Sequence, residues 1–326
     1  MDCVLGVDGG NSKTVAAVAT TEGRILGLAR AEGSNHERIG FDETERLLER
    51  VTRGSLAQAD VEMPIAAAFW GLAGADVESD FAALDAIVAR VGVARTNVVK
   101  NDLSAAMAAG LSRTWGVGIV FGAGFSSGGI GPDGREIKMP SMGAVTGDWG
   151  GGEVLALEVL RLAHRSYDGR GEKSRLEAGT LAVLGLASFE ELPARIRDES
   201  LDWEAARAAL PPLLFDVADG GDNVARDLIV QVGEEVGTTA VALITRLGLH
   251  DTDVEVVLGG SVFRGRGSLL LETIRNAIVA SAPDAQVILP DLPPVAGAVF
   301  EAIRSLGIEV DDRIRGNVRE SLPEGG

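Results

Sequence analysis

The chain has 326 residues, of which 46% are hydrophobic and 24% charged, which is enough for a large core and two domains of ordinary size. Its net charge is −18, with 48 acidic and 30 basic residues, so the protein's own field opposes binding to nucleic acid or to an anionic membrane. We therefore expect no nucleic-acid partner and no membrane association. A small phosphate ligand is still compatible, because backbone amides, one lysine and a metal ion can bind it locally.

Cysteine usage and the N-terminal pattern indicate a reducing compartment. Cys3 is the one cysteine, so no internal disulfide can form, and no Cys/His group has zinc-ligand spacing. Strand pattern begins within three residues of the start, without the basic segment and apolar run of a secretory signal. No stretch is expected to reach the apolar length that crosses a bilayer. These features predict a cytoplasmic protein.

The first hundred residues alternate between strand and helix patterns. Short apolar runs at 4–7, 14–19 and 25–29, separated by glycine turns, predict an opening β-meander. The other elements expected here are helices around 42–51 and 81–91, strands at 65–70 and 96–102, and a helix that starts at Leu103.

The same order then recurs, which suggests two related α/β halves. A strand at 116–121 is followed by the stretch "GAGFSSGG", interpreted as a loop, by the turn "GPDG" and by the strand "REIKM". The middle, about 153–250, is predicted to be mostly helical, with interruptions at "LPPLLF" and "ADGGDN". A strand at 254–258, a helix at 269–280 and a proline-led final helix follow, and residues 311–326 are expected to form a flexible tail.

Two standard nucleotide motifs are excluded. The opening stretch "LGVDGGNSKT" has Lys13-Thr14 but Ser12 where a P-loop needs glycine, and a strand pattern follows it. In "GAGFSSGG", Ser127 stands at the third glycine position of G-x-G-x-x-G, again before a strand pattern, so a Rossmann dinucleotide site is not expected.

Three glycine loops after strands remain as candidate phosphate sites, at 8–14, 122–128 and 259–261. Gly9 and Gly10 can adopt positive φ and leave room for an anion, and the Ser12, Lys13 and Thr14 side chains offer donors. Taken alone, the "DGG" turn is better explained as an ordinary β-hairpin turn, and the phosphate interpretation depends on the three loops together.

Three aspartates lie in or between these loops. Asp8 can hold Mg²⁺ through water against the terminal phosphates of a nucleotide, or it can simply initiate a turn. Asp102 can act as a general base toward a substrate hydroxyl that attacks a γ-phosphate, or it can be a helix N-cap. Asp148 has glycines around it that permit close approach of a ligand, although a glycine loop before a helix looks the same.

Eight segments, taken in order, resemble the BadF/BadG/BcrA/BcrD-type ATPase family, which includes N-acetylglucosamine kinase and belongs to the actin, sugar kinase and Hsp70 superfamily. They cover roughly residues 4–305 and read "GVDGGNSKT", "GSNHERIG", "GLAGAD", "VVKNDLSAA", "VFGAGFSSGG", "GDWGGGE", "VVLGGSVF" and "PPVAGAVFEAI". The resemblance implies an α/β fold of two ribonuclease-H-like (actin-like ATPase) domains with ATP and substrate in the interdomain cleft. The expected domains are residues 1–113 and 114–295, with a helix at 296–308 returning to the first domain.

The resemblance also implies a role for each matching residue. Asp102 matches the catalytic base, and Asp8 is expected to hold Mg²⁺. The expected ATP-binding residues are Gly9, Gly10, Asn11, Ser12, Lys13, Thr14, Gly122, Ala123, Gly124, Gly259, Gly260 and Ser261. The expected substrate-binding residues are Asn35, Gly74, Asp102, Met142, Gly143 and Asp148.

The implied activity is that of an ATP-dependent sugar kinase. The γ-phosphate of MgATP would pass in line to a hydroxyl, expected to be O6, of an amino sugar or hexose, with N-acetylglucosamine and glucosamine as the leading candidates. Two residues depart from the family pattern on the sugar side: Ala123 stands where these kinases usually carry threonine, and Met142 stands where an aromatic residue is usual. The family often dimerises, so a homodimer is a further expectation.

Two alternatives stay open at this point. One is an ATPase that activates a 2-hydroxyacyl-CoA dehydratase. Such activators bind an iron-sulfur cluster between subunits through cysteines, and Cys3 is the single cysteine available here. The other is a non-catalytic nucleotide- or sugar-binding regulator, for which a transcriptional role is not expected, because no DNA-binding pattern precedes residue 4.

Overall fold

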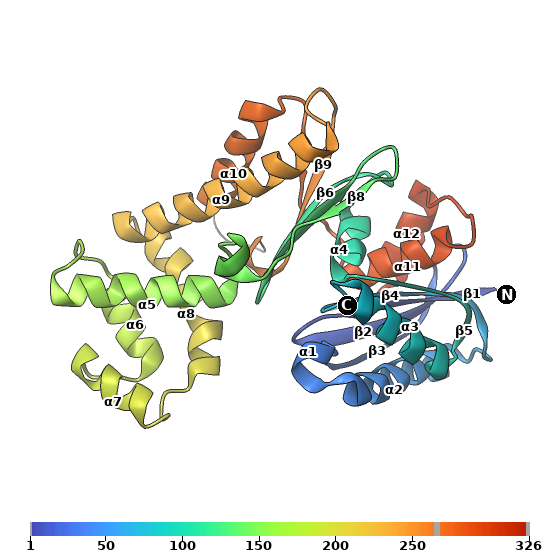
Figure 1. The fold of residues 1–326 in the computed structure, drawn as a ribbon, viewed down its shortest axis with the longest axis horizontal. Coiled ribbons are helices and arrows are strands. Elements are labelled where there is room, and N and C mark those ends of the chain that lie inside the picture. The colour runs from blue at the N-terminus through green and yellow to red at the C-terminus, as the bar shows by residue number, and fades with distance from the viewer. Residues whose placement is uncertain (1, 264–267, 324–326) are drawn as a thin grey trace.

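The computed structural model describes residues 2–263 and 268–323, which form two lobes, each built on a five-stranded sheet (Figure 1). The first sheet has the order β3-β2-β1-β4-β5 and the second the order β10-β9-β6-β7-β8. In both sheets, the first three strands along the chain pair antiparallel and the next two add in parallel. The recurrence seen in the sequence is therefore a repeated topology.

The first sheet consists of β1 (Cys3–Gly9), β2 (Lys13–Thr20), β3 (Ile25–Glu32), β4 (Ile65–Leu72) and β5 (Ala94–Lys100). Every residue of β4 is buried, as expected of an apolar strand covered on both faces. One face carries α2 (Phe41–Ala59) and α3 (Glu78–Val91), preceded by the short α1 (His36–Ile39). The other face carries α11 (Pro294–Arg304) and α12 (Asp312–Ser321).

Helix α4 (Asp102–Gly110) lies where the two lobes meet (Figure 1). On one side it packs against α11, and Gly297 makes this contact possible, because a Cβ at that position would lie 1.9 Å from the Ala105 carbonyl oxygen. On the other side Leu103, Met107 and Leu111 form a small buried cluster with Val257 of the second sheet. The helix is therefore fixed by both lobes.

The second sheet consists of β6 (Gly116–Phe121), β7 (Phe125–Ile130), β8 (Glu136–Lys138), β9 (Glu255–Gly259) and β10 (Gln286–Ile288). Helices α9 (Asn223–Leu247) and α10 (Ser268–Ser281) pack against each other on this lobe. The remaining helical elements, which extend away from the first lobe in Figure 1, are α5 (Gly152–Asp168), α6 (Leu176–Leu184), α7 (Leu192–Arg197) and α8 (Trp203–Asp219). Short 3-10 turns lie at Gly143–Thr146, Phe189–Glu191 and Ser261–Phe263.

Helix α9 corrects one expectation. With 25 residues and an apolar composition, it is, by length and composition alone, the one described helix that could cross a membrane. Half of its most apolar segment is buried inside the protein, against α10 and the strands β6 and β7. A buried core helix passes the same test as a membrane span, and this packing is that of a core helix.

Three local predictions are wrong. Residues 312–321 form α12 rather than part of a flexible tail, because Ile314 and Val318 are buried against the first lobe. The "LPPLLF" stretch does not interrupt the helical middle, since α8 runs through Pro211 and Pro212. The second glycine loop is shorter than expected, because β7 already begins at Phe125.

Candidate active site

A cleft of about 960 Å³ opens between the lobes and brings together residues from distant parts of the chain. Its walls include members of all three predicted glycine loops and one predicted sugar contact, Asn35. The predicted residues that line it are Asn11, Ser12, Asn35, Gly122, Ala123, Gly124 and Ser261.

The first loop is the tight turn between β1 and β2, closed by a 2.9 Å hydrogen bond from the Gly10 N–H to the Lys13 carbonyl. The Gly10 carbonyl accepts from the Ser34 N–H at 3.1 Å, and the Gly9 carbonyl accepts from the Ala73 N–H at 2.7 Å. The candidate phosphate loop is therefore also a hairpin turn, and hydrogen bonds from the loops at Ser34 and Ala73 hold it in place.

Thr14 differs from its prediction. Its side chain is fully buried, and its hydroxyl donates a 2.8 Å hydrogen bond to the Glu32 carbonyl between β2 and β3. The side chain is therefore closed to a ligand, and the structure gives no support to Thr14 as an ATP contact. Asn11 and Ser12, by contrast, are exposed in the cleft.

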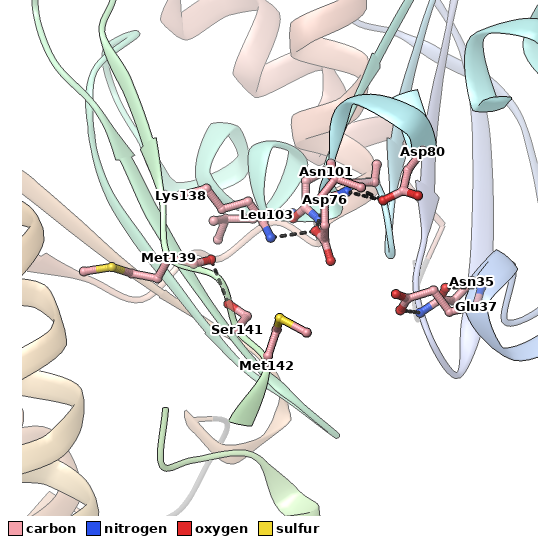
Figure 2. Close-up of polar contacts among 12 residues, drawn as sticks. Asn35, Glu37, Asp76, Asp80, Asn101, Leu103, Lys138, Met139, Ser141 and Met142 are labelled. Atoms are coloured by element: carbon pink, nitrogen blue, oxygen red, sulfur yellow. Dashed lines mark hydrogen bonds and ion pairs between the residues drawn. The ribbon is translucent and has the colours of Figure 1, made fainter. Parts of the chain in front are cut away.

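Asn35 connects the first loop to the expected sugar side. Its Oδ1 caps α1 by accepting from the Glu37 N–H at 2.9 Å, and its Nδ2 donates to Asn11 Oδ1 at 2.7 Å. The same Nδ2 lies 3.4 Å from Glu37 Oε2, and Figure 2 shows Asn35 and Glu37 side by side. Because Asn35 is buried and its amide is bonded on both ends, its orientation is fixed.

Gly74 lies directly against this group, at φ +82°. A Cβ at this position would lie 2.5 Å from Asn35 Oδ1 and 2.9 Å from His36 Cε1. Glycine is therefore required for two reasons, the left-handed backbone and the close packing of the loop on Asn35.

The second loop, Gly122-Ala123-Gly124, joins β6 to β7 and packs on the N-terminus of α5. The Gly122 and Ala123 carbonyls accept from the N–H groups of Gly152 and Glu153, at 2.8 and 3.3 Å. The loop carbonyls thus satisfy amides that a helix start leaves without intrahelical partners. Of the third loop, Ser261 lines the main cleft, whereas Gly259 and Gly260 line a separate, smaller pocket. Residues 264–267 lie outside the described part of the chain.

Asp102 is the first residue of α4, and it is not the N-cap. Asn101 holds that position, and its Oδ1 accepts from the Leu103 N–H at 3.1 Å. The alternative interpretation of Asp102 as an N-cap is therefore wrong. Burial raises the pKa of the Asp102 carboxyl to about 6, and the negative charge of Asp76 adds to the rise while Lys138 opposes it. The carboxylate remains largely ionised at neutral pH.

Asp8 lies at the same edge of the first sheet, because β1, β4 and β5 are parallel and end together. Burial raises the pKa of Asp8 to about 7; the charge of Asp102 acts in the same direction and Lys13 opposes it. Two carboxylates that repel each other in this way favour a bound cation.

The donor set at Asp8 fits Mg²⁺ with few protein ligands. Among residues 2–263 and 268–323, no group of three or more His, Cys, Asp or Glu side chains is arranged to hold a metal ion. Mg²⁺ commonly binds through one or two carboxylates, with water and substrate phosphates as its remaining ligands. Asp8 supplies one such carboxylate beside the first loop.

The segment with Met142, Gly143 and Asp148 forms a short turn after β8. Met142 is 69% exposed, and the Asp148 N–H donates to the Gly143 carbonyl at 3.0 Å. The Asp148 carboxylate accepts from the Thr146 hydroxyl. None of the three lines the main cleft, so this structure does not bring them together with Asn35.

Sequence reasoning missed one wall of the cleft. This wall is a face of α8, and its members are Glu204, Arg207, Ala208, Pro211, Pro212 and Phe215. Glu37 and Arg38 of α1 and Glu153 of α5 also line the cleft and were not predicted. Arg207 pairs with Glu153 at 3.3 Å. The adjacent prolines Pro211 and Pro212 were the sequence signal for this wall. Proline is costly inside a helix, so a pair of prolines there indicates a position with a special role.

Comparison with known proteins decides the family. The BadF/BadG/BcrA/BcrD ATPase family matches residues 5–302. The protein belongs to this family. Membership implies ATP binding, and the two-lobed fold is that of the actin-like ATPases and related sugar kinases.

Relatives of this BadF/BadG-type ATPase include two kinases. The N-acetylmuramic acid/N-acetylglucosamine kinase of Clostridium acetobutylicum is 25% identical over 303 residues, covering 93% of this chain and 98% of the relative. The N-acetyl-D-glucosamine kinase of Dictyostelium discoideum is 25% identical, with 92% and 98% covered. Among solved structures, a proposed N-acetylglucosamine kinase from Chromobacterium violaceum superimposes with a TM-score of 0.70 at 21% identity, covering 92% of this chain and 98% of that one.

Cys3 bears on the dehydratase-activator alternative within this family. It lies in β1 in the core of the first lobe, with 4% of its surface exposed. A cysteine that shares an iron-sulfur cluster between subunits has to reach the protein surface. The burial of Cys3 therefore argues against that role.

Proposed function

We propose that this BadF/BadG-type ATPase is an ATP-dependent sugar kinase that phosphorylates a hydroxyl, expected to be O6, of an amino sugar or hexose. The observation that carries the proposal is the position of Asp102. Asp102 is the first residue of α4, where the two lobes meet, and it lies near Asp8. It is not the helix cap, and it lies outside the set of residues that line the main cleft. A carboxylate with a raised pKa in such a position suits a general base.

In the proposed reaction, Asp102 accepts the proton of the sugar hydroxyl while that oxygen forms a bond to the γ-phosphorus of ATP. The bond from this phosphorus to the β–γ bridging oxygen breaks, and ADP leaves. Exposed donors of the first loop, including Asn11 and Ser12, and the backbone of Gly122 to Gly124 bind the phosphates. Mg²⁺ at Asp8 would neutralise charge on the β- and γ-phosphates.

The sugar is proposed from the relatives. Two of them are named as kinases of N-acetylglucosamine, one of which also takes N-acetylmuramic acid. N-Acetylglucosamine and glucosamine are accordingly the first substrates to test. Asn35, which is fixed by Asn11 and Gly74, is the proposed hydroxyl contact on the sugar side.

The test is ADP release from MgATP with a panel of N-acetylglucosamine, glucosamine, glucose and N-acetylmuramic acid. The proposal predicts turnover that depends on at least one of these sugars, with the product phosphate located by NMR. Nucleotide binding without sugar-stimulated turnover across the panel would contradict it and would favour a non-catalytic regulator.

A further inference from the structure

One hydrogen-bonded group joins the two lobes next to Asp102 and has no part in the function described so far. Lys138, the last residue of β8 in the second lobe, places its Nζ 2.6 Å from Asp76 Oδ1 in the first lobe. The same Asp76 oxygen accepts from Asn101 Nδ2 at 2.9 Å. Figure 2 shows the Lys138 ammonium pointing toward Asp76, with Asn101 close to Asp76. We call these three residues the inter-lobe network.

The network ends on the helix that carries Asp102. Asn101 is buried, with 7% of its surface exposed, and its Oδ1 caps α4 at the Leu103 N–H. Its Nδ2 also lies 3.5 Å from the Ala75 carbonyl. All polar atoms of the Asn101 side chain are therefore committed, and the Asn101 orientation depends on where Asp76 is held.

The ion pair within the network is more than a surface contact. The side chains of Asp76 and Lys138 are 33% and 27% exposed, and the Asp76 carboxylate also accepts from an amide that is buried. Exposed ion pairs contribute little because solvent screens them, whereas a partly buried pair with a shared hydrogen bond loses more when one partner is removed. Lys138 also acts on Asp102 through its charge, since it offsets the effect of Asp76 on the pKa of Asp102.

We propose that Lys138 is a positioning residue for phosphoryl transfer, which sets the place of Asp102 from the opposite lobe through Asp76 and Asn101. The inference rests on the proposed function, because it takes Asp102 to be the base. Lys138 comes from the second lobe, and its contact with Asp76 holds the Asn101 cap at the N-terminal end of α4. The placement of the base therefore depends on a contact made by the opposite lobe.

A second ion pair between the lobes provides a matched control. Lys100 of β5 pairs with Glu136 of β8 at 2.9 Å, also between the lobes, but with side chains that are 39% and 53% exposed. Lys100 precedes Asn101 directly in the chain, yet its ammonium does not contact Asp76. Lys100→Met and Lys138→Met therefore make the same chemical change and each removes one ion pair between the lobes.

The kinetic test compares wild type, Lys138→Met, Lys138→Arg and Lys100→Met with the sugar that gives turnover. The expected result for Lys138→Met is a kcat lowered on the order of 10- to 100-fold, as for a misplaced catalytic group. The KM for ATP is expected to stay within about twofold of wild type. Lys138→Arg, which can pair with Asp76, should recover most of the rate, and Lys100→Met should match wild type. An unchanged kcat in Lys138→Met, or a raised KM for ATP with kcat retained, would overturn the proposal.

A second readout does not need kinase activity. Hydrogen exchange of the backbone amides at 101–104 reports directly on the cap of α4, because the Leu103 N–H is bonded to Asn101 Oδ1. Exchange should be faster in Lys138→Met than in wild type and Lys100→Met, at equal overall thermal stability. Equal exchange in all three proteins would refute the network. If wild type shows no sugar-dependent turnover while the exchange result holds, the proposed function fails and the positional link from Lys138 to α4 stands.

Discussion

Asn35 and Asn11 are joined by a 2.7 Å hydrogen bond from the Asn35 Nδ2 to the Asn11 Oδ1. Asn11 belongs to the loop assigned to ATP, and Asn35 to the side assigned to the sugar. One bond therefore links the two proposed ligand sites within the first lobe. Its donor direction is fixed, because the Asn35 oxygen is already used by the Glu37 N–H.

Asn35→Asp tests this link. The new carboxylate can still cap α1, but it cannot donate to Asn11, and it brings a negative charge next to Glu37. Loss of one such hydrogen bond costs on the order of 1 kcal/mol, so the KM for sugar should rise roughly fivefold. Gln58→Glu is the control: it is the same amide-to-acid change at an exposed position whose side-chain oxygen accepts from the Leu28 N–H. Equal KM values for the two variants and wild type would argue against Asn35 as a sugar contact.

Gly74→Ala separates backbone strain from packing. Gly74 and Gly169, the C-cap of α5, have nearly the same φ, +82° and +81°, but a Cβ at Gly169 meets nothing within 4 Å. Both alanine variants should lose about 1–2 kcal/mol of stability from the left-handed backbone. Only Gly74→Ala should displace Asn35 and raise the KM for sugar. Calorimetry and initial rates check the two effects, and a Gly169→Ala variant with the same kinetic defect would contradict the assignment.

Asp8 should make the protein less stable as pH rises. Its pKa is raised from 3.8 to about 7, so between these two pH values the folded protein holds a proton that the unfolded chain has lost. The free energy of unfolding therefore falls as pH increases across this window. Asp8→Asn removes this contribution and should raise Tm more at pH 8 than at pH 4, while it weakens Mg²⁺-dependent turnover. Thermal melts without Mg²⁺ at both pH values measure it; an equal Tm change at both would show that Asp8 has an ordinary pKa.

Arg315 should stabilise the C-terminal helix α12. Its guanidinium donates to the Leu111 carbonyl at the end of α4 and lies 4.7 Å above the Phe300 ring. Arg315→Ala should lower the free energy of unfolding by roughly 1–3 kcal/mol, because a hydrogen bond to a charged group and a cation–π contact are lost. Arg313→Ala, at an exposed position of the same helix, should change stability by less than about 0.5 kcal/mol. Equal urea midpoints for the two variants would indicate that α12 is held by Ile314 and Val318 alone.

Much of the fold could be predicted because strand and glycine signals are local. Local composition is sufficient to predict the apolar strand β4, the turn at Gly9 and Gly10, and the repeated pattern that begins at Gly116. Proline and charge patterns gave poorer guidance. Pro211 and Pro212 are tolerated inside α8, and charged α12 is ordered by two buried side chains, because tertiary packing overrides local preference.

The candidate site was predictable where residues contact the cleft through backbone loops. Side-chain burial was not predictable, and it decides the outcome for Thr14, whose hydroxyl is used within the sheet. The α8 wall of the cleft and the inter-lobe network could not be predicted either, because both depend on side-chain contacts between distant parts of the chain. Lys138 and Asp76 are 62 residues apart, and no local pattern states that they meet.

The most direct test of the central claim is the initial rate of sugar-dependent ADP release by Asp102→Asn. The amide keeps the shape of the side chain but cannot accept the sugar proton, so the account predicts a kcat lower by roughly 10²- to 10⁴-fold with ATP binding retained. An Asp102→Asn protein that turns over at the wild-type rate would contradict the assignment of Asp102 as the base.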